Sequence, residues 1–338
     1  MSKPAPIDWN GLLQWSSQYH DGTRPASDFK PLSGEDKKFL EGAMAQAFGE
    51  VEDYNELMQD AINKISTDFD NSDTVYTALE VVDKCCDNLD VPRNLHLFGG
   101  IEVMLKTLEH PNADIACKGA SLFALMLQNN EEIQKLTDEA GALDKIYKFS
   151  DRDENCLFRA LGLASALIRN ESALEEKFVS GPGSALLTRS LATDHVVRVR
   201  TKGVNLLRWL LIQQKIKGEA VNQFAIALAE CVALDYDNLN YGDSVANTCS
   251  ALWKLAPSGD AGSKLKAAAA ARKTVLATDA DWDDRSVEIE LLKELEAAPV
   301  PVPSAAPAAP AEPVGPVLSL TEQPNNATTG GYSSKMGN

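Results

Sequence analysis

Apolar and polar positions alternate along most of this chain with the spacing of amphipathic helices, and the pattern repeats. One helix face carries apolar residues at equivalent places in successive copies, at Val82, Phe123 and Ala164, which are 41 residues apart. Glycine or proline punctuates the copies at the same interval, at Gly100, Gly141 and Pro182. A fixed period built from helical patterns predicts stacked copies of one helical unit, each of which needs a neighbour to bury its apolar face.

A period of roughly 40–47 residues with two or three helices per copy is typical of armadillo and HEAT repeats. The sequence therefore predicts an all-α, armadillo/HEAT-like right-handed helical solenoid with N-terminal helices and a disordered C-terminal tail. Such a fold presents a stacked surface for binding rather than a pocket built around chemistry.

Three regions follow from the pattern. Residues 1–72 are expected to form an N-terminal helical or flexible region, residues 73–297 the armadillo-like repeat domain, and residues 298–338 a disordered tail rich in proline and alanine. Eight of the sixteen prolines lie in the last forty residues, and such a segment cannot bury enough apolar surface to offset its chain entropy. A helix is predicted to begin at Ser33, because Asp36 three residues later completes a capping-box-like start.

Helices are expected before the copies over residues 7–19, 33–48, about 51–66 and 74–88, with a loop at 20–31. Three copies then follow, each ending in a long helix, and the third is two residues longer than the others. A fourth copy and two closing helices complete the solenoid, because terminal repeats must cover the exposed end of the core. The copies cover about 91–130, 131–170, 171–214 and 216–257, and the closing helices 259–297.

The charge balance narrows the classes of partner. The formal net charge is −17, whereas a nucleic-acid binder needs an excess of Lys and Arg to neutralise phosphates. An anionic membrane surface is disfavoured for the same reason, and no apolar run approaches the ~20 residues that span a bilayer. We therefore expect no nucleic-acid and no membrane partner.

The cysteines and the N-terminus indicate the compartment. The six cysteines form no C-x-x-C pair and lie mostly within helical patterns, which is typical of small buried core residues in a reducing environment. The first residues lack the continuous apolar stretch of a signal peptide. We expect a cytoplasmic protein.

One stretch departs from the acidic balance. Between Arg189 and Lys217 the chain carries seven Lys or Arg residues against one acidic residue, Asp194. Such a run is usually a solvated helix face. The alternative is a patch that steers an acidic protein partner, and its electrostatic candidates are Arg200, Lys202 and Arg208.

Signals of catalysis are weak. The glycine-containing segment 181–187 opens a helix and lacks the strand that precedes a phosphate-binding loop. The four histidines form no H-x-x-x-H pair, and no nucleophile lies beside a base in a recognisable frame. We therefore expect a binding protein that is not an enzyme and that needs no cofactor and no metal.

The long helices are expected to place a column of residues on the inside of the solenoid's curve. The column consists of Lys84, Asn88, Leu125, Asn129, Ala166, Asn170, Trp209 and Gln213. It resembles the Trp–Asn ladder with which armadillo proteins hold an extended peptide, but here Asn and Trp never share a copy. Helix C-capping is an equal alternative for the asparagines, because Asn tolerates the left-handed conformation found at helix ends.

Several segments, in order and in the right repeat phase, carry a more specific resemblance. They are LLQW at 12–15, LSGEDKKFLEGAMAQAF at 32–48, DNLD at 87–90, QNNEEIQ at 128–134, RALGLASALIRN at 159–170 and RVRTKGVNLLRWLLI at 198–212. Together they resemble the armadillo-type nucleotide exchange factors of DnaK-type (heat shock protein 70) chaperones, the heat-shock-70-binding-protein family. The resemblance covers about residues 11–218, and it departs at Val91-Pro92, where that family usually has Asn-Ala.

The resemblance implies a non-catalytic co-chaperone. Its concave face would clasp one lobe of the ATPase domain of a cytosolic heat shock protein 70 chaperone and promote ADP release, and the factor would act as a monomer. By match to the family, the expected contacts are Asn88, Asp90, Gln128, Asn129, Arg169 and Asn170. The rival functions are an armadillo-type scaffold that binds a linear peptide or partner protein on its concave face and, more remotely, a regulatory subunit of an enzyme.

Overall fold

The computed structural model describes residues 33–48, 53–88, 90–234, 238–278 and 282–300. The chain divides into two units, residues 1–301 and 302–338, and every described residue lies in the first. The helix predicted over 7–19, the loop predicted over 20–31 and the tail beyond residue 300 therefore lie outside the described residues. All regular elements of the described part are helical, as predicted.

Two helices precede the repeats. Helix α2 (Gly34–Phe48) begins as a capping box, because Ser33 Oγ accepts the Asp36 N–H at 3.1 Å and the Asp36 carboxylate accepts the Ser33 N–H at 3.2 Å. Helix α3 (Tyr54–Thr67) begins three residues later than predicted, since the Asp53 carboxylate accepts the backbone N–H of Asn55.

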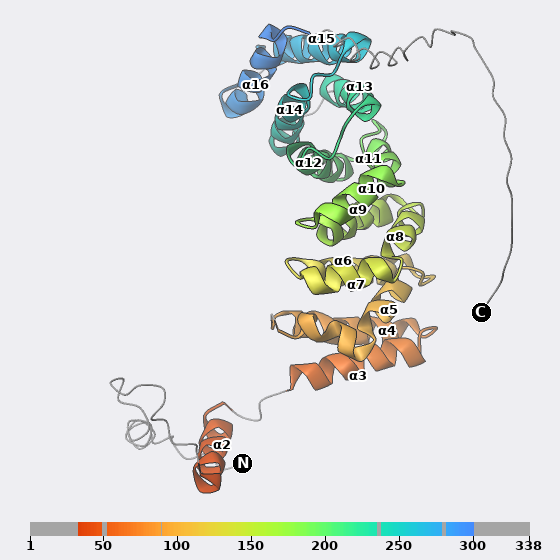
Figure 1. The fold of residues 1–338 in the computed structure, drawn as a ribbon, viewed down its shortest axis with the longest axis vertical. Helices are drawn as coiled ribbons and strands as arrows, with labels where there is room; N and C mark the ends of the chain where they lie inside the picture. The colour runs from red at the N-terminus through yellow and green to blue at the C-terminus, as the bar shows by residue number, and fades with distance from the viewer. Residues whose placement is uncertain (1–32, 49–52, 89, 235–237, 279–281, 301–338) are drawn as a thin grey trace, which may run out of the picture. The chain divides into compact units, whose positions relative to one another are not determined.

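The last helix of each copy, together with α4 before the copies and α16 after them, forms one row in which each helix contacts the next (Figure 1). Its members are α4 (Ser72–Cys86), α6 (Ala113–Leu127), α9 (Glu154–Ile168), α12 (Val197–Ile212), α14 (Leu239–Trp253) and α16 (Ser286–Ala297). We call this the long-helix row. The first three members start at N-caps 41 residues apart, at Asn71, Asn112 and Asp153, whose side-chain oxygens accept backbone N–H groups of the first turn. Helix α4 therefore begins at Ser72, two residues before the start predicted at residue 74.

Shorter helices precede the long ones. They are η2 (Pro92–Phe98) with α5 (Gly100–Thr107), α7 (Glu131–Glu139) with α8 (Ala142–Ser150), and α10 (Ser172–Ser180) with α11 (Gly183–Ser190). Copies one to three thus contain three helices each. The fourth copy has α13 (Glu219–Ala233) before α14, and the end is closed by α15 (Gly259–Leu276), the short η3 (Trp282–Arg285) and α16.

The core follows the predicted apolar stripe. Val82, Phe123 and Ala164 are fully buried. Short and long helices approach closely where the long helix has glycine, because a Cβ atom on Gly203 would lie 2.0 Å from the Ser190 Oγ. Gly119 of the first copy meets Thr107 in the same way, at 2.2 Å. Glycine at this position in copies one and three therefore permits this close approach of the two layers.

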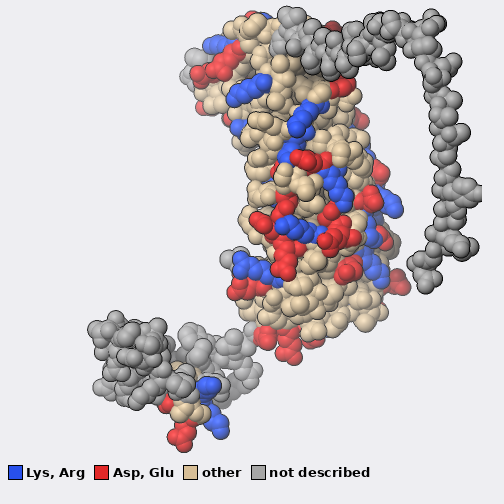
Figure 2. All heavy atoms as spheres, in the orientation of Figure 1, with Lys and Arg blue, Asp and Glu red and all other residues tan. Residues whose placement is uncertain are grey.

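Ion pairs connect neighbouring copies, mostly through their shorter helices. The Lys177 Nζ lies 2.7 Å from an Asp138 carboxylate oxygen, and the Lys215 Nζ lies 2.9 Å from a Glu176 carboxylate oxygen. Two further inter-copy pairs are Lys145 with Glu109 and Arg189 with Asp151. Figure 2 shows basic and acidic side chains next to one another over the middle of the stack. Such partly exposed pairs each contribute less than about 1 kcal/mol to folding.

A buried charge cluster closes the C-terminal end of the solenoid. The Arg272 Nε lies 3.1 Å from one Glu288 carboxylate oxygen, and the Arg285 Nη1 lies 3.4 Å from the other. All three side chains are almost fully buried. The cluster joins α15, η3 and α16.

All six cysteines are buried, as predicted. Burial, with a smaller contribution from the Asp83 carboxylate, raises the pKa of the Cys86 thiol to about 12. A thiol with such a pKa stays protonated at neutral pH and is a poor nucleophile. The cysteines are therefore packing residues. Among the described residues, no helix has the length and apolar character needed to cross a membrane.

Candidate partner-binding face

Four of the nine predicted contact residues line one hollow on the long-helix row. Gln128 and Asn129 follow the end of α6, Arg169 and Asn170 follow the end of α9, and Trp209 of α12 completes the wall. The hollow has a volume of about 440 Å³. The repeat register brings these residues together, because equivalent ends of adjacent long helices lie side by side. We call it the Arg169 hollow.

The Arg169 side chain lies against the tryptophan of the next copy. Its guanidinium carbon is 5.0 Å from the centre of the Trp209 ring, a distance at which the cation is attracted to the ring face. The Arg169 Nε is buried and has no hydrogen-bond partner among the described residues. A planar guanidinium held in this way presents its outer N–H groups to a carboxylate or carbonyl oxygen from outside.

A buried carboxylate fixes the orientation of the tryptophan. The Trp209 Nε1–H donates to Glu175 Oε1 at 2.9 Å, and Glu175 is only 3% exposed. The Lys215 Nζ lies 3.8 Å from the other oxygen of the same carboxylate. A buried charge of this kind needs both a counter-charge and hydrogen bonds, so the ring, the carboxylate and the ammonium form one connected unit.

Gln134 of α7 holds the backbone beneath Arg169. Its Nε2 donates to the carbonyl oxygens of Ala166 at 2.7 Å and of Arg169 at 3.1 Å. Carbonyl groups in the last turn of a helix lack hydrogen-bond donors within the helix. The buried Gln134 amide donates to two of them. Gln134 and Glu175 were not among the predicted site residues, but they are 41 residues apart. The repeat register is the signal that would have identified both.

The recurring asparagines are helix caps as well as hollow-lining residues. Asn129 has φ 56° and Asn170 has φ 68°, and in the third copy Gln214 takes the same left-handed conformation with φ 56°. The capping interpretation is therefore confirmed for Asn129 and Asn170. Both also line the Arg169 hollow, so capping and contact with a partner are compatible at these positions.

The remaining two residues from the family match lie after α4. The Asn88 Oδ1 accepts the Asp90 N–H at 3.1 Å, and the Asp90 carboxylate pairs with Arg93 at 3.2 Å. Both residues are exposed. They lie one copy before the Arg169 hollow and do not line it.

The three electrostatic candidates differ in burial. Arg200 is only 6% exposed, and its Nη1 donates to the carbonyl oxygens of Thr193 at 2.9 Å and His195 at 2.7 Å. Its role as a partner contact was inferred from charge alone, and its burial corrects that inference: Arg200 supports the turn before α12. Lys202 and Arg208 are half-buried on the same helix. The Lys202 Nζ lies 4.0 Å from the centre of the Phe158 ring.

A second hollow of about 450 Å³ lies on the same row, between α4, α6 and α9. Gln128 lines it as well as the Arg169 hollow, so the two are adjacent. Its wall includes the exposed Leu125, which is 47% accessible, together with Lys118, Arg159 and the acidic Asp83. The row therefore offers amide, cationic and apolar groups in one continuous region.

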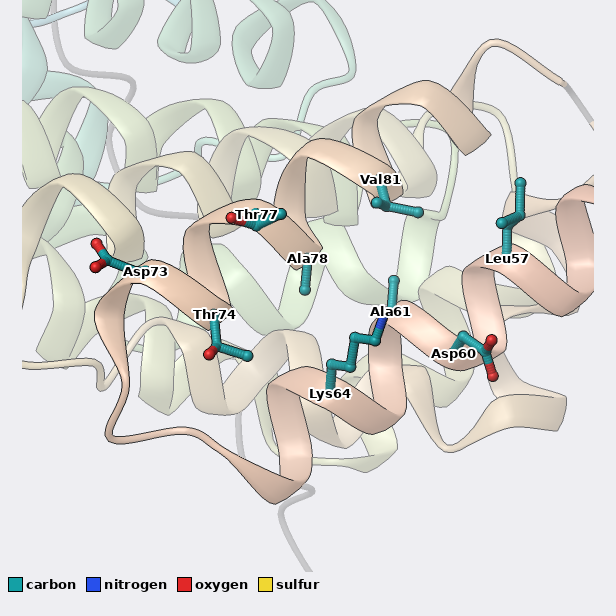
Figure 3. Close-up of a pocket in the computed structure, with 9 residues that line it drawn as sticks. All are labelled: Leu57, Asp60, Ala61, Lys64, Asp73, Thr74, Thr77, Ala78 and Val81. Carbon is teal, nitrogen blue, oxygen red and sulfur yellow. The ribbon is translucent and has the colours of Figure 1, made fainter.

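A separate groove of about 430 Å³ lies between α3 and α4 (Figure 3). Leu57, Ala61, Ala78 and Val81 give it an apolar lining, and carboxylates stand at its rim. None of the predicted contact residues lines this groove. It therefore stays outside the candidate site.

Comparison with curated proteins agrees with the resemblance seen in the sequence. The chain is 26% identical over 224 residues to human "Hsp70-binding protein 1", a match that covers 62% of each chain. It is 27% identical over 253 residues to the "Hsp70 nucleotide exchange factor FES1" of Candida glabrata, covering 71% of this chain and 84% of that protein. The predicted resemblance is confirmed.

The match to the Hsp70-binding proteins covers only part of their length. The chain spans about three-fifths of the length of the curated Hsp70-binding proteins that it matches, in human, rat and mouse alike. No family model matches the chain.

Solved structures support the fold. A computationally designed armadillo repeat protein for modular peptide recognition superposes with a TM-score of 0.55 at 15% identity, covering 70% of this chain and 99% of that protein. A designed armadillo repeat protein in complex with the peptide (KR)4 gives the same TM-score and identity, with 72% of this chain covered and all of the other. The solenoid predicted from the 41-residue period is therefore an armadillo-type solenoid.

Proposed function

We propose that this protein is a co-chaperone that binds the ATPase domain of a cytosolic heat shock protein 70 chaperone and promotes ADP release. The observation that carries the proposal is the Arg169 hollow, in which residues chosen from the family resemblance converge from two copies. Relatives named as an Hsp70-binding protein and as an Hsp70 nucleotide exchange factor support it.

The proposed mechanism requires only differential binding. If the long-helix row fits the chaperone with its nucleotide cleft open better than with the cleft closed, binding shifts the population toward the open form. By linkage the nucleotide then binds more weakly. A coupling of roughly 4 kcal/mol would weaken ADP binding about a thousandfold. No group on this chain needs to react, so the proposal includes no catalysis and no cofactor.

Each element of the hollow has a role in this proposal. Arg169, supported by Trp209, would donate to a carboxylate or carbonyl oxygen of the chaperone, as planar guanidinium groups do in tight interfaces. The side-chain amides of Gln128 and Asn129 would supply neighbouring hydrogen bonds. Because Glu175 and Gln134 already hold the ring and the helix end, little side-chain ordering would be left to occur on binding.

A second function is favoured by one observation. Asn129, Asn170 and Trp209 belong to three different copies, yet they line a single hollow, so an amide and an indole do face the same ligand position. An armadillo-type scaffold that binds a linear peptide uses such groups. The chain would then bind an extended segment without altering any nucleotide.

The release of a fluorescent ADP analogue distinguishes the two functions. With stoichiometric protein, we expect release from a cytosolic heat shock protein 70 chaperone to accelerate at least tenfold, and the protein alone to hydrolyse no ATP. Size-exclusion chromatography with light scattering should show a monomer before mixing and a one-to-one complex after it. Tight binding with unchanged ADP release would favour the scaffold, and the absence of both with every cytosolic isoform would refute the co-chaperone proposal.

A further inference from the structure

Three basic side chains gather around one aromatic ring on the long-helix row. The ring is that of Phe158 on α9, and its centre lies 4.0 Å from the Lys202 Nζ, 5.3 Å from the Arg198 guanidinium carbon and 5.4 Å from that of Arg159. Lys202 and Arg198 are one helical turn apart on α12. We call these four residues the Phe158 cluster.

The cluster carries a concentration of like charge that the fold itself does not neutralise. None of the three cations takes part in an ion pair among the described residues. Burial lowers the pKa of Lys202, and the charge of Arg159 lowers it further. The Arg159 Nε is buried without a hydrogen-bond partner in the described part of the chain. The ring face offsets part of this repulsion, and an added anion would offset more.

The backbone makes room for the lysine. A Cβ atom on Gly162 would lie 2.7 Å from the Lys202 Nζ, so the ammonium occupies space that a larger residue would take. Gly162 also lines the Arg169 hollow, and Arg159 also lines the second hollow beside Lys118. The cluster therefore borders both hollows, so a ligand that spans them would pass beside it.

We propose that the Phe158 cluster is an anion-binding site that receives side-chain carboxylates of a protein partner. A guanidinium group can bind a carboxylate through two parallel N–H donors, and a lysine ammonium group can pair with one as a point charge. Phosphate would suit them too, but the chain's net charge of −17 repels polyanionic nucleic acid over long range. A short acidic segment avoids most of that repulsion, because it brings few charges and places them at the cluster.

This inference rests on the proposed function for the identity of the partner, and the acidic segment would belong to the chaperone's ATPase domain. Charge pairs that close on binding affect both the affinity and its salt dependence. The cluster would therefore make association weaken as salt is added, whereas the uncharged amides of the Arg169 hollow would contribute much less to that dependence.

The test compares two double variants with the same change in net charge. Arg159→Gln with Arg198→Gln removes two cations of the cluster, and Lys148→Gln with Lys217→Gln removes two exposed cations elsewhere. Affinity is measured by calorimetry for two probes, the chaperone's ATPase domain and a hexaglutamate peptide, at low and high salt. Melting temperatures and circular dichroism establish that both variants are folded.

We expect the cluster variant to bind both probes at least tenfold more weakly at low salt and with a flatter salt dependence than the control variant. If the wild type binds hexaglutamate but not the chaperone, and the cluster variant loses the hexaglutamate binding, the result would support the carboxylate site and refute the proposed function. Equal affinities for the cluster and control variants, no hexaglutamate binding by the wild type, or preference for a phosphoserine peptide over hexaglutamate would overturn the carboxylate site.

Discussion

Two groups of cations in this solenoid lie in different places, and a further cation, Lys118 of α6, pairs with Glu80 within the long-helix row. On the shorter helices, Lys145, Lys177 and Arg189 each pair with an acidic residue of the neighbouring copy. On the long-helix row, Arg159, Arg169, Arg198 and Lys202 rest against aromatic rings and form no ion pair within the described residues.

A shortage of acidic residues does not explain the difference. The chain has 49 Asp and Glu against 32 Lys and Arg, so acids outnumber bases by 17. The four cations of the long-helix row rest on aromatic rings instead of on carboxylates, although acidic residues are in excess. The paired group stabilises the stacking of copies, and we attribute the unpaired group to binding a partner.

The largest loss of stability is expected at the buried ion pairs of Glu288 with Arg272 and Arg285. Glu288→Ala would leave Arg272 and Arg285 buried without their shared counter-charge, and breaking such a cluster typically destabilises a protein by about 3–5 kcal/mol. Urea unfolding followed by circular dichroism measures this loss. Glu109→Gln, which removes an exposed partner of Lys145, is the control and should change stability by less than about 1 kcal/mol. Similar losses in both variants would remove the distinction between buried and exposed pairs.

A smaller effect separates capping from binding at the hollow. Asn129→Ala keeps the Cβ atom, which is crowded in the left-handed conformation, but removes the amide that helps Asn to tolerate it. The free energy of unfolding should fall by roughly 1–2 kcal/mol. Asn129→Gly accepts that conformation freely and removes only the amide. We expect the glycine variant to melt near the wild-type temperature while binding the chaperone more weakly. A glycine variant with full affinity would show that Asn129 acts only as a cap.

The repeat period accounts for most of what the sequence predicted correctly. The helical solenoid, the capping box at Ser33 and the convergence of Gln128 with Arg169 all depend on local pattern and on register. A fixed 41-residue interval transmits the solenoid and the convergence from copy to copy, whereas the capping box precedes the repeats and depends on local pattern alone. The same interval also links Gln134 to Glu175, a relation that family motifs alone did not reveal.

Charge counting was less informative than helical geometry. Arg198 and Lys202 are four residues apart and share one face of α12, whereas Arg200 lies between them and points into the core. Residues two apart on a helix face nearly opposite directions, so the basic residues of α12 cannot all lie on one exposed face. The contact of Lys202 with Phe158 depends on how α9 and α12 pack, and no local pattern encodes that.

The most direct test reverses one charge on the long-helix row and one on a shorter helix. Arg169→Glu changes the long-helix row, and Lys148→Glu makes the same change on the exposed surface of α8. Calorimetry with the isolated ATPase domain of a heat shock protein 70 chaperone measures the affinity of each folded variant. We predict that Arg169→Glu weakens binding by roughly 30-fold or more, which corresponds to about 2 kcal/mol at a central interface residue, and that Lys148→Glu leaves it nearly unchanged. Full affinity in Arg169→Glu, or a comparable loss in Lys148→Glu, would contradict the assignment of the long-helix row as the binding face.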